Sequence, residues 1–388
     1  MNDNRSSVHL RDVPDSPFGK QAVMLGLAAL LAVALTAAAT NPGNGGWRLA
    51  EGVTQENLTV FPVVSSQPVD TSAFVTLDQA LSSGDAVVSE EGNVLLRSRD
   101  GHAIYRPVPF QSGGSQVNQL VLVNRGKRPI ILLAGEIVSG GKQDRIVGKD
   151  RIVPVGGEPL PLDVFCVEHG RWTEVSANFA SAGIMVHPSV RERAAVEQNQ
   201  QEVWSAVDIG TTSSNLDQTP EAPLAHISRD SIASTIQKEA PTESYRKIYA
   251  SGAIGSGVES FTEQMARRFE RATANLKSER VVGVVVAYGD EVAWSDVFAS
   301  PELFQSYWPK LLRSYVVEAM ARPATRGHAT AEDARDFLRP FDGHTKEESE
   351  PGVYRWTEHT EGGTAEIELE ALEPKPMVLH WLKVLRSN

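Results

Sequence analysis

Short apolar runs, each ended by turn residues, follow one another from about residue 57 to residue 172. The expected strands are 58–64, 85–88, 93–96, 103–108, 119–124, 129–133, 144–147, 151–154 and 162–167. Glycine-bearing turns such as Glu91-Gly92 and Asn124-Arg125-Gly126 separate them. Many short strands joined by such turns predict a β-rich antiparallel sheet, arranged as a sandwich or a partial barrel.

Apolar residues take on a helical spacing in the second half of the chain. Phe261, Met265 and Phe269 share one face of a helix predicted over 257–277. Further helices are predicted at 190–207 and 301–320, and strands at 280–288 and between 353 and 385. The polar stretch 209–242 predicts a flexible insertion. We therefore expect an α+β fold over 57–385, with helices packed against the sheet.

The amino terminus has the pattern of a membrane or export segment. Residues 21–40 carry no charge and would span about 30 Å as a helix, which matches the hydrocarbon core of a bilayer. The polar leader 1–20 contains three cations, and this favours a retained transmembrane helix with a cytoplasmic amino terminus. A signal sequence cleaved near Ala39, which would give a secreted or periplasmic protein, is the alternative. Both interpretations put the ectodomain, after a Gly- and Asn-rich linker at 41–56, outside the cytoplasm.

Composition narrows the range of partners. The net charge is -12, and no basic run offsets it, so a nucleic acid is not an expected partner. Cys166 is the single cysteine, which excludes an intramolecular disulfide. Its position in an expected strand is typical of a small core residue.

Two of the expected strands lead into loops that are rich in polar residues. Glu136, Lys142, Gln143 and Arg145 follow the strand at 129–133, and Glu168, Arg171 and Trp172 follow the strand at 162–167. Strand ends deliver polar groups to loops, so the two loops predict one polar pocket. The alternative is that the glycines only turn the chain and the charges form surface salt bridges.

Each of these side chains has a chemical role in the predicted pocket. Glu136 and Glu168 would form a pair of catalytic carboxylates, one of them acting as a general acid. The binding residues would be Lys142, Arg145 and Arg171 for an anionic group, Gln143 for neutral hydrogen bonds and Trp172 for stacking. This set suits a carboxylate, phosphate or sugar ligand.

The signatures of several other chemistries are incomplete. In the stretch 135–142, Gly141 separates Gly140 from Lys142, which is not the spacing of a phosphate-binding P-loop. No Gly-x-Ser-x-Gly elbow occurs, and the nine histidines form no His-x-His or His-Glu-x-x-His pair. We therefore expect no cofactor and no metal.

The loops also carry a family resemblance. The segments Ala134-Gly-Glu136, Gly140-Gly-Lys-Gln143 with Arg145, Val167-Glu168, Gly170-Arg-Trp172, and Gln200/Gln201 before Trp204 resemble the bacterial ARG and rhodanese-phosphatase-superfamily-associated protein domain, over about 55–385. The family name refers to gene association with ADP-ribosylglycohydrolase-like and phosphatase-like proteins, so the resemblance implies nucleotide or ADP-ribose ligands. The predicted export segment departs from that implication, because nucleotide metabolism is scarce outside the cytoplasm.

Three functions remain open from the sequence. The first is a membrane-anchored, ligand-binding module of the envelope. The second is a hydrolase or transferase that uses Glu136 and Glu168 on an anionic or glycosyl substrate. The third is a structural or interaction protein, whose contact face would be the aromatic helix at 301–320.

Overall fold

The computed structural model describes residues 46–90, 94–97, 103–106, 119–141, 143–167, 176–209, 245–250, 252–322 and 327–386. The predicted leader, membrane segment and nearly all of the predicted insertion at 209–242 lie outside these ranges. Within the described ranges, no helix is long and apolar enough to cross a bilayer.

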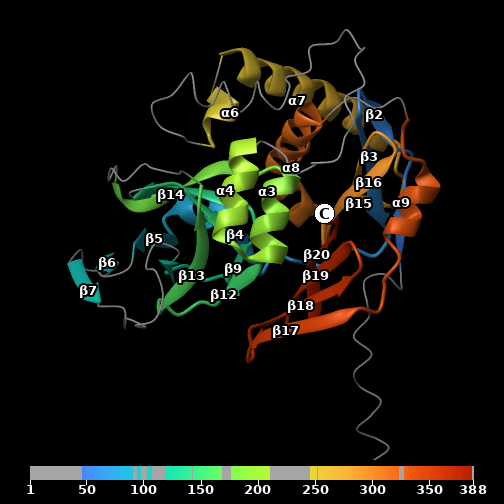
Figure 1. The fold of residues 1–388 in the computed structure, drawn as a ribbon. Coiled ribbons are helices and arrows are strands. Elements are labelled where there is room, and N and C mark those ends of the chain that lie inside the picture. Colours follow the sequence, from blue (N-terminus) through green and yellow to red (C-terminus); the bar gives the residue numbers. More distant parts are fainter. Residues whose placement is uncertain are drawn as a thin grey trace, which may run out of the picture.

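Six antiparallel strands close into a barrel (Figure 1). In order around the barrel they are β10 (Glu136–Gly141), β11 (Arg145–Val147), β13 (Pro159–Cys166), β8 (Gln119–Asn124), β5 (Ala86–Glu90) and β14 (Ser176–Met185). Alternate residues of these strands, among them Val88, Leu122 and Val164, form a separate apolar cluster inside. The sequence prediction of a β-rich antiparallel arrangement is confirmed, and closure removes the exposed edges that a sandwich would have.

A second, nine-stranded antiparallel sheet lies beside the barrel. Its members are β1 (Trp47–Leu49), β2 (Val53–Gln55), β3 (Leu58–Ser65), β15 (Arg280–Tyr288), β16 (Glu291–Phe298), β17 (His344–Glu350), β18 (Tyr354–Glu361), β19 (Thr364–Ala371) and β20 (Met377–Leu385). Strands from the beginning and the end of the domain thus belong to one sheet. The expected linker at 41–56 needs correction, because from Trp47 onward this segment contributes β1 and β2.

Helices pack between and around the two β-structures, as expected for an α+β fold. Helix α8 (Pro301–Ala321) contacts both β14 of the barrel and β15 of the sheet, and α7 (Gly252–Thr273) packs on α8 (Figure 1). The other helices of the described ranges are α2 (Leu77–Ser83), α3 (Pro188–Glu192), a π-helix (Arg193–Glu197), α4 (Gln200–Ile209), α6 (Lys247–Ala250) and α9 (Ala331–Phe337). The largest apolar cluster draws residues from barrel, sheet and helices, so they share one core.

Short strands complete the structure. A small sheet has the order β12 (Arg151–Val153), β9 (Ile130–Leu132) and β4 (Val75–Thr76), and β6 (Val94–Arg97) pairs with β7 (Ala103–Arg106). The glycine-rich stretch expected as a loop after residue 133 is instead barrel strand β10. The helix predicted over 190–207 is divided, because Gln198 adopts a left-handed conformation with a φ of 51°.

Candidate functional site

Residues next to the two predicted polar loops lie at one end of the barrel. Because neighbouring strands are antiparallel, β5, β10 and β13 end where β8, β11 and β14 begin. Arg145 pairs with Cys166 on one side and Val138 on the other, so β11, which carries Arg145, is a neighbour of β13, which leads into the second predicted loop. We call this region the Arg145 end of the barrel.

Arg145 is a buried cation with few partners. Its side chain comes from the barrel-facing side of β11, since its cross-strand partner Val138 belongs to the inner cluster. Only 3% of Arg145 is exposed, and its Nε is buried without a hydrogen-bond partner. Nη1 donates long hydrogen bonds of 3.3 Å to Gln143 Oε1 and 3.4 Å to the Asp144 carbonyl. The Asp144 carboxylate lies 4.0 Å from Arg246 instead.

A carboxylate reaches the same end from β5. Glu90 pairs with Leu120 of the inner cluster, which directs its side chain to the barrel interior as well. A Cβ on Gly141, whose φ is 53°, would come within 2.8 Å of Glu90 Oε1 and 2.5 Å of the Phe179 ring. Only glycine fits here, so β10 approaches Glu90 and Phe179 closely. The Arg145 end therefore combines a cation, a carboxylate and the buried amide of Gln143.

Helix α4 braces this end through its first residue. Gln200 Nε2 donates to the carbonyl of Cys166 (3.0 Å), and Gln200 Oε1 accepts from the Cys166 amide (2.8 Å). The carboxamide thus pairs with both backbone groups of Cys166, as a neighbouring strand would, at the end of β13. Gln200 thus has a structural role in holding the end of β13.

Glu136 does not lie at the Arg145 end and has other partners. It is 1% exposed and lies at the start of β10, where Oε2 accepts from the Leu133 amide (2.7 Å) and Oε1 accepts from Lys310 Nζ of α8 (2.5 Å). Lys310 also donates to Asp78 of α2 (2.6 Å). The opposite end of the barrel from Arg145 is therefore closed by an ion cluster in which two carboxylates share one ammonium.

Burial and charge act in opposite directions in this cluster. Burial raises the pKa of Glu136, Lys310 lowers it in part, and the nearby Asp78 charge raises it again, with a net rise. Burial alone would lower the pKa of Lys310, but the two carboxylates outweigh it and raise the pKa. The two carboxylates thus favour the charged form of Lys310, while burial favours the protonated form of Glu136.

A closed ring of hydrogen bonds joins the barrel to the nine-stranded sheet. Ala134 N donates to Asp150 Oδ1 (2.7 Å), and Asp150 Oδ2 contacts His380 Nδ1 (2.5 Å). His380 Nε2 contacts Asp296 Oδ1 (2.9 Å). Arg191 completes the ring, because its Nη1 donates to Asp296 (2.9 Å) and its Nε to the Ala134 carbonyl (2.7 Å). Four charged side chains from β16, β20, α3 and the turn before β12 thus enclose the backbone of Ala134, which lies between β9 and barrel strand β10.

Electrostatics in the ring are balanced. Burial would raise the pKa of Asp296, but Arg191 and His380 outweigh burial and lower the pKa far below the usual range. Burial would lower the pKa of His380, yet Asp150 reverses this and raises it. Both ring nitrogens of His380 also contact carboxylate oxygens, and this arrangement favours the protonated ring. With all four side chains buried, the ring serves structure and is closed to a ligand.

The predicted site residues are divided by the structure. Gln143 and Arg145 lie together at the Arg145 end, whereas Glu136 lies at the opposite end of β10 among other partners. Lys142, Glu168, Arg171 and Trp172 lie outside the described residues. Four charged residues of these sites have no signal in the sequence, namely Glu90, Lys310, Asp296 and His380. They lie in four separate segments of the chain, and no local spacing links them.

One protein-family model matches nearly all of the described fold. A family model for the ARG and Rhodanese-Phosphatase-superfamily-associated Protein domain, ARPP-1, matches residues 46–383. The chain belongs to this family. No curated protein and no solved structure matches the chain. The ARPP-1 match begins just before β1 and ends within β20, so the barrel and the nine-stranded sheet belong to one ARPP-1 domain.

Proposed function

We propose that this ARPP-1 domain binds a small anionic ligand at the Arg145 end of the barrel. The observation that carries the proposal is a buried guanidinium that forms no ion pair within the described part of the chain. A buried charge is costly unless an opposite charge and hydrogen bonds compensate it. An anion that accepts the unused Nε–H of Arg145 would provide both.

Arg191 provides an internal comparison. It is as deeply buried as Arg145, at 1% exposure, but forms an ion pair with Asp296 at 2.8 Å. Where this fold needs a buried arginine for structure, it thus supplies a carboxylate. Arg145 lacks that partner among the described residues, and this supports a binding role.

The neighbouring side chains favour a sugar-phosphate or nucleotide ligand. The planar fork of an arginine matches a phosphate or carboxylate group. Glu90 adds a carboxylate, which accepts hydrogen bonds from hydroxyl groups but repels a bare anion. A ligand with both a phosphate and ribose or sugar hydroxyls would match the cation and the carboxylate at this end, in keeping with the ligands that the family resemblance implies.

The hydrolase alternative gains less support from the geometry. Both oxygens of Glu136 are engaged, by the Leu133 amide and by Lys310, and the side chain is buried at the other end of β10. A general acid must lie within hydrogen-bond reach of the bond it cleaves. We therefore favour binding, and we assign no catalytic step to Glu136.

Replacing Arg145 by Gln tests the binding site directly. Inorganic phosphate, ribose 5-phosphate, AMP and ADP-ribose are titrated by calorimetry, with thermal unfolding measured in parallel. We expect R145Q to weaken binding of the phosphate esters by about 10- to 100-fold, because a charge-assisted hydrogen bond is lost. The melting temperature of the free variant should stay unchanged or rise, since a buried unpaired charge has been removed.

Arg128→Gln is the matched control, because Arg128 is an exposed arginine in the turn between β8 and β9, beyond the other end of the barrel. It should bind as the wild type does. The proposal would be refuted if the wild-type protein bound none of the four probes. So would an R145Q variant that unfolds several degrees earlier, because that result assigns Arg145 a structural role.

The proposal includes a location outside the cytoplasm, behind a membrane helix at 21–40. The uncharged length of that segment and the cations before it support this location. Full-length protein should sediment with membranes and resist an alkaline wash. A soluble product beginning near Thr40 would indicate the cleaved-signal alternative, and recovery in the cytosol would contradict both.

A further inference from the structure

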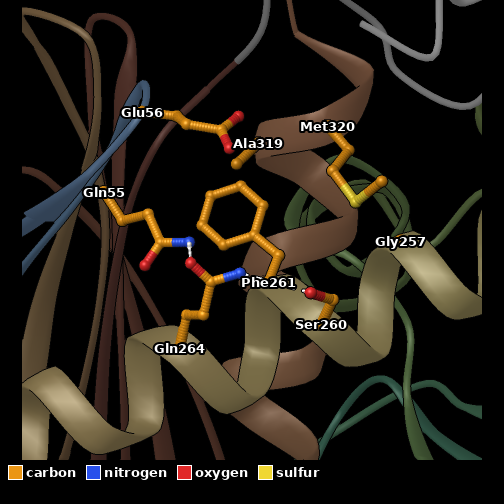
Figure 2. A pocket seen from close by; sticks show the side chains of 8 residues that line it. All are labelled: Gln55, Glu56, Gly257, Ser260, Phe261, Gln264, Ala319 and Met320. Carbon is orange, nitrogen blue, oxygen red and sulfur yellow. Dashed lines mark hydrogen bonds between the residues drawn. The ribbon is translucent and has the colours of Figure 1, made fainter. Parts of the chain in front are cut away.

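A small hollow opens where the β2–β3 turn meets α7 and α8. It shares no residue with the Arg145 end of the barrel. Its volume is about 170 Å³, and its walls comprise Gln55, Glu56, Gly257, Ser260, Phe261, Gln264, Ala319 and Met320 (Figure 2). Sites for drug-sized ligands are typically about 300–1,000 Å³. The hollow therefore suits a headgroup or the end of a side chain.

Glu56 is the one charged side chain in this wall. Its carboxylate extends toward Ala319 above the ring of Phe261 (Figure 2). Ala319 and Met320 belong to the last turn of α8, where the helix dipole presents partial negative charge. Both features favour a cation in the hollow.

The remaining walls suit a cation that carries apolar groups. Phe261 and Met320 provide an aromatic ring and a thioether, and a ring face attracts an organic ammonium group. Gln55 Nε2 donates to Gln264 Oε1 at 3.4 Å, while Gln55 Oε1 is buried without a hydrogen-bond partner. This hydrogen bond fixes the Gln55 carboxamide as part of the wall, with Oε1 directed away from the hollow (Figure 2).

The backbone at Glu56 is strained. Gln55 pairs with Leu58, so Glu56 and Asn57 form a two-residue hairpin turn, in which Glu56 has a φ of 52°. Asn and Gly adopt this left-handed conformation more readily than Glu does. Asn57 fastens the turn to α8 by donating from Nδ2 to the Ala319 carbonyl (2.9 Å). A long acidic side chain is thus held over the hollow at a position where a smaller residue would be more stable.

We propose that this hollow is a binding site for a small organic ammonium ion. The Glu56 carboxylate and the carboxyl end of α8 balance the positive charge, and Phe261 and Met320 contact the carbon atoms. The site is independent of the Arg145 end, in both its residues and the sign of its ligand.

Choline and its uncharged isostere 3,3-dimethylbutan-1-ol are the probes that test this proposal. Saturation-transfer difference NMR on the purified full-length chain, titrated with each probe, gives their dissociation constants. Choline should bind at least about tenfold more tightly than the alcohol, because only choline has the charge that Glu56 and the helix end recognise. Equal binding of both probes would overturn the proposal, and so would no binding of choline.

Variants locate the site. E56Q should weaken choline binding at least about tenfold, and Phe261→Leu about fivefold, since the ring face is lost. Glu270→Gln removes the same charge from the exposed face of α7 and should bind as the wild type does. Glu56→Asn should lose choline binding while its melting temperature stays equal or rises. If E56Q and E56N bound choline as the wild type does, the choline site would lie elsewhere and the assignment would be refuted.

Discussion

Replacing Asp296 by Asn is expected to lower the free energy of unfolding by about 3–5 kcal/mol at pH 7. The variant keeps the shape of the side chain but leaves Arg191 and His380 facing a neutral amide in a buried place. The donors Trp294 and Tyr315, which also bond to Asp296 Oδ2, lose their charged acceptor. Urea unfolding followed by tryptophan fluorescence measures the change.

The deficit of D296N should depend on pH. The folded pKa of Asp296 is lowered from its ordinary 3.8, so its contribution to stability is present above about pH 4 and is lost as pH falls through the folded pKa. The pKa of His380 is raised from 6.5, so its contribution is complete below about pH 6.5 and is lost as pH rises through the folded pKa. The difference in stability between the wild type and D296N should therefore shrink progressively as the pH falls below about 4.

Asp163→Asn is the control for this prediction, because Asp163 is an exposed residue of β13. A surface change of this kind should alter stability by no more than about 0.5 kcal/mol. If D296N were as stable as D163N, the ring of Asp150, His380, Asp296 and Arg191 would not hold the barrel on the sheet.

Replacing Lys310 by Met is expected to destabilise the fold by a similar amount, about 3–5 kcal/mol near neutral pH. Met preserves the apolar stem but leaves Glu136 buried opposite Asp78 without a cation. The pKa of Glu136, already raised by burial, should rise further. A carboxyl group with a raised folded pKa contributes stability at low pH and loses it as pH rises, so the deficit should be larger at pH 8 than at pH 5.

A second substitution distinguishes this mechanism from a simple packing defect. Glu136→Gln in the Lys310→Met background removes the uncompensated charge, and it should recover most of the lost stability in a double-mutant cycle. Lys277→Met, at an exposed position after α7, should be neutral. A deficit that is equal at pH 5 and pH 8, with no rescue by E136Q, would show that packing and not charge is responsible.

Local patterning was enough to predict the elements whose apolar residues repeat at a regular interval. The strands β8 and β15 and helix α8 lie where the sequence predicts them, because each buries a face defined by its own side chains. The sequence did not predict strands β1, β2, β4, β10, β14, β16 and β17, and three of these show why. Strand β14 is rich in small residues, β10 in glycine, and the exposed edge strand β17 in charged residues that need no apolar face.

The sequence by itself determined the α+β class, the antiparallel pairing and the gathering of Gln143 and Arg145, because a strand and its following loop are set by neighbours along the chain. Tertiary structure alone decided which charges meet. Asp150, Arg191, Asp296 and His380 are spread over more than half of the chain, and only the docking of β20 and β16 on the barrel brings them into one ring. Long-range charge pairing leaves no local periodicity, since its energy comes from burial shared by segments that are distant in sequence.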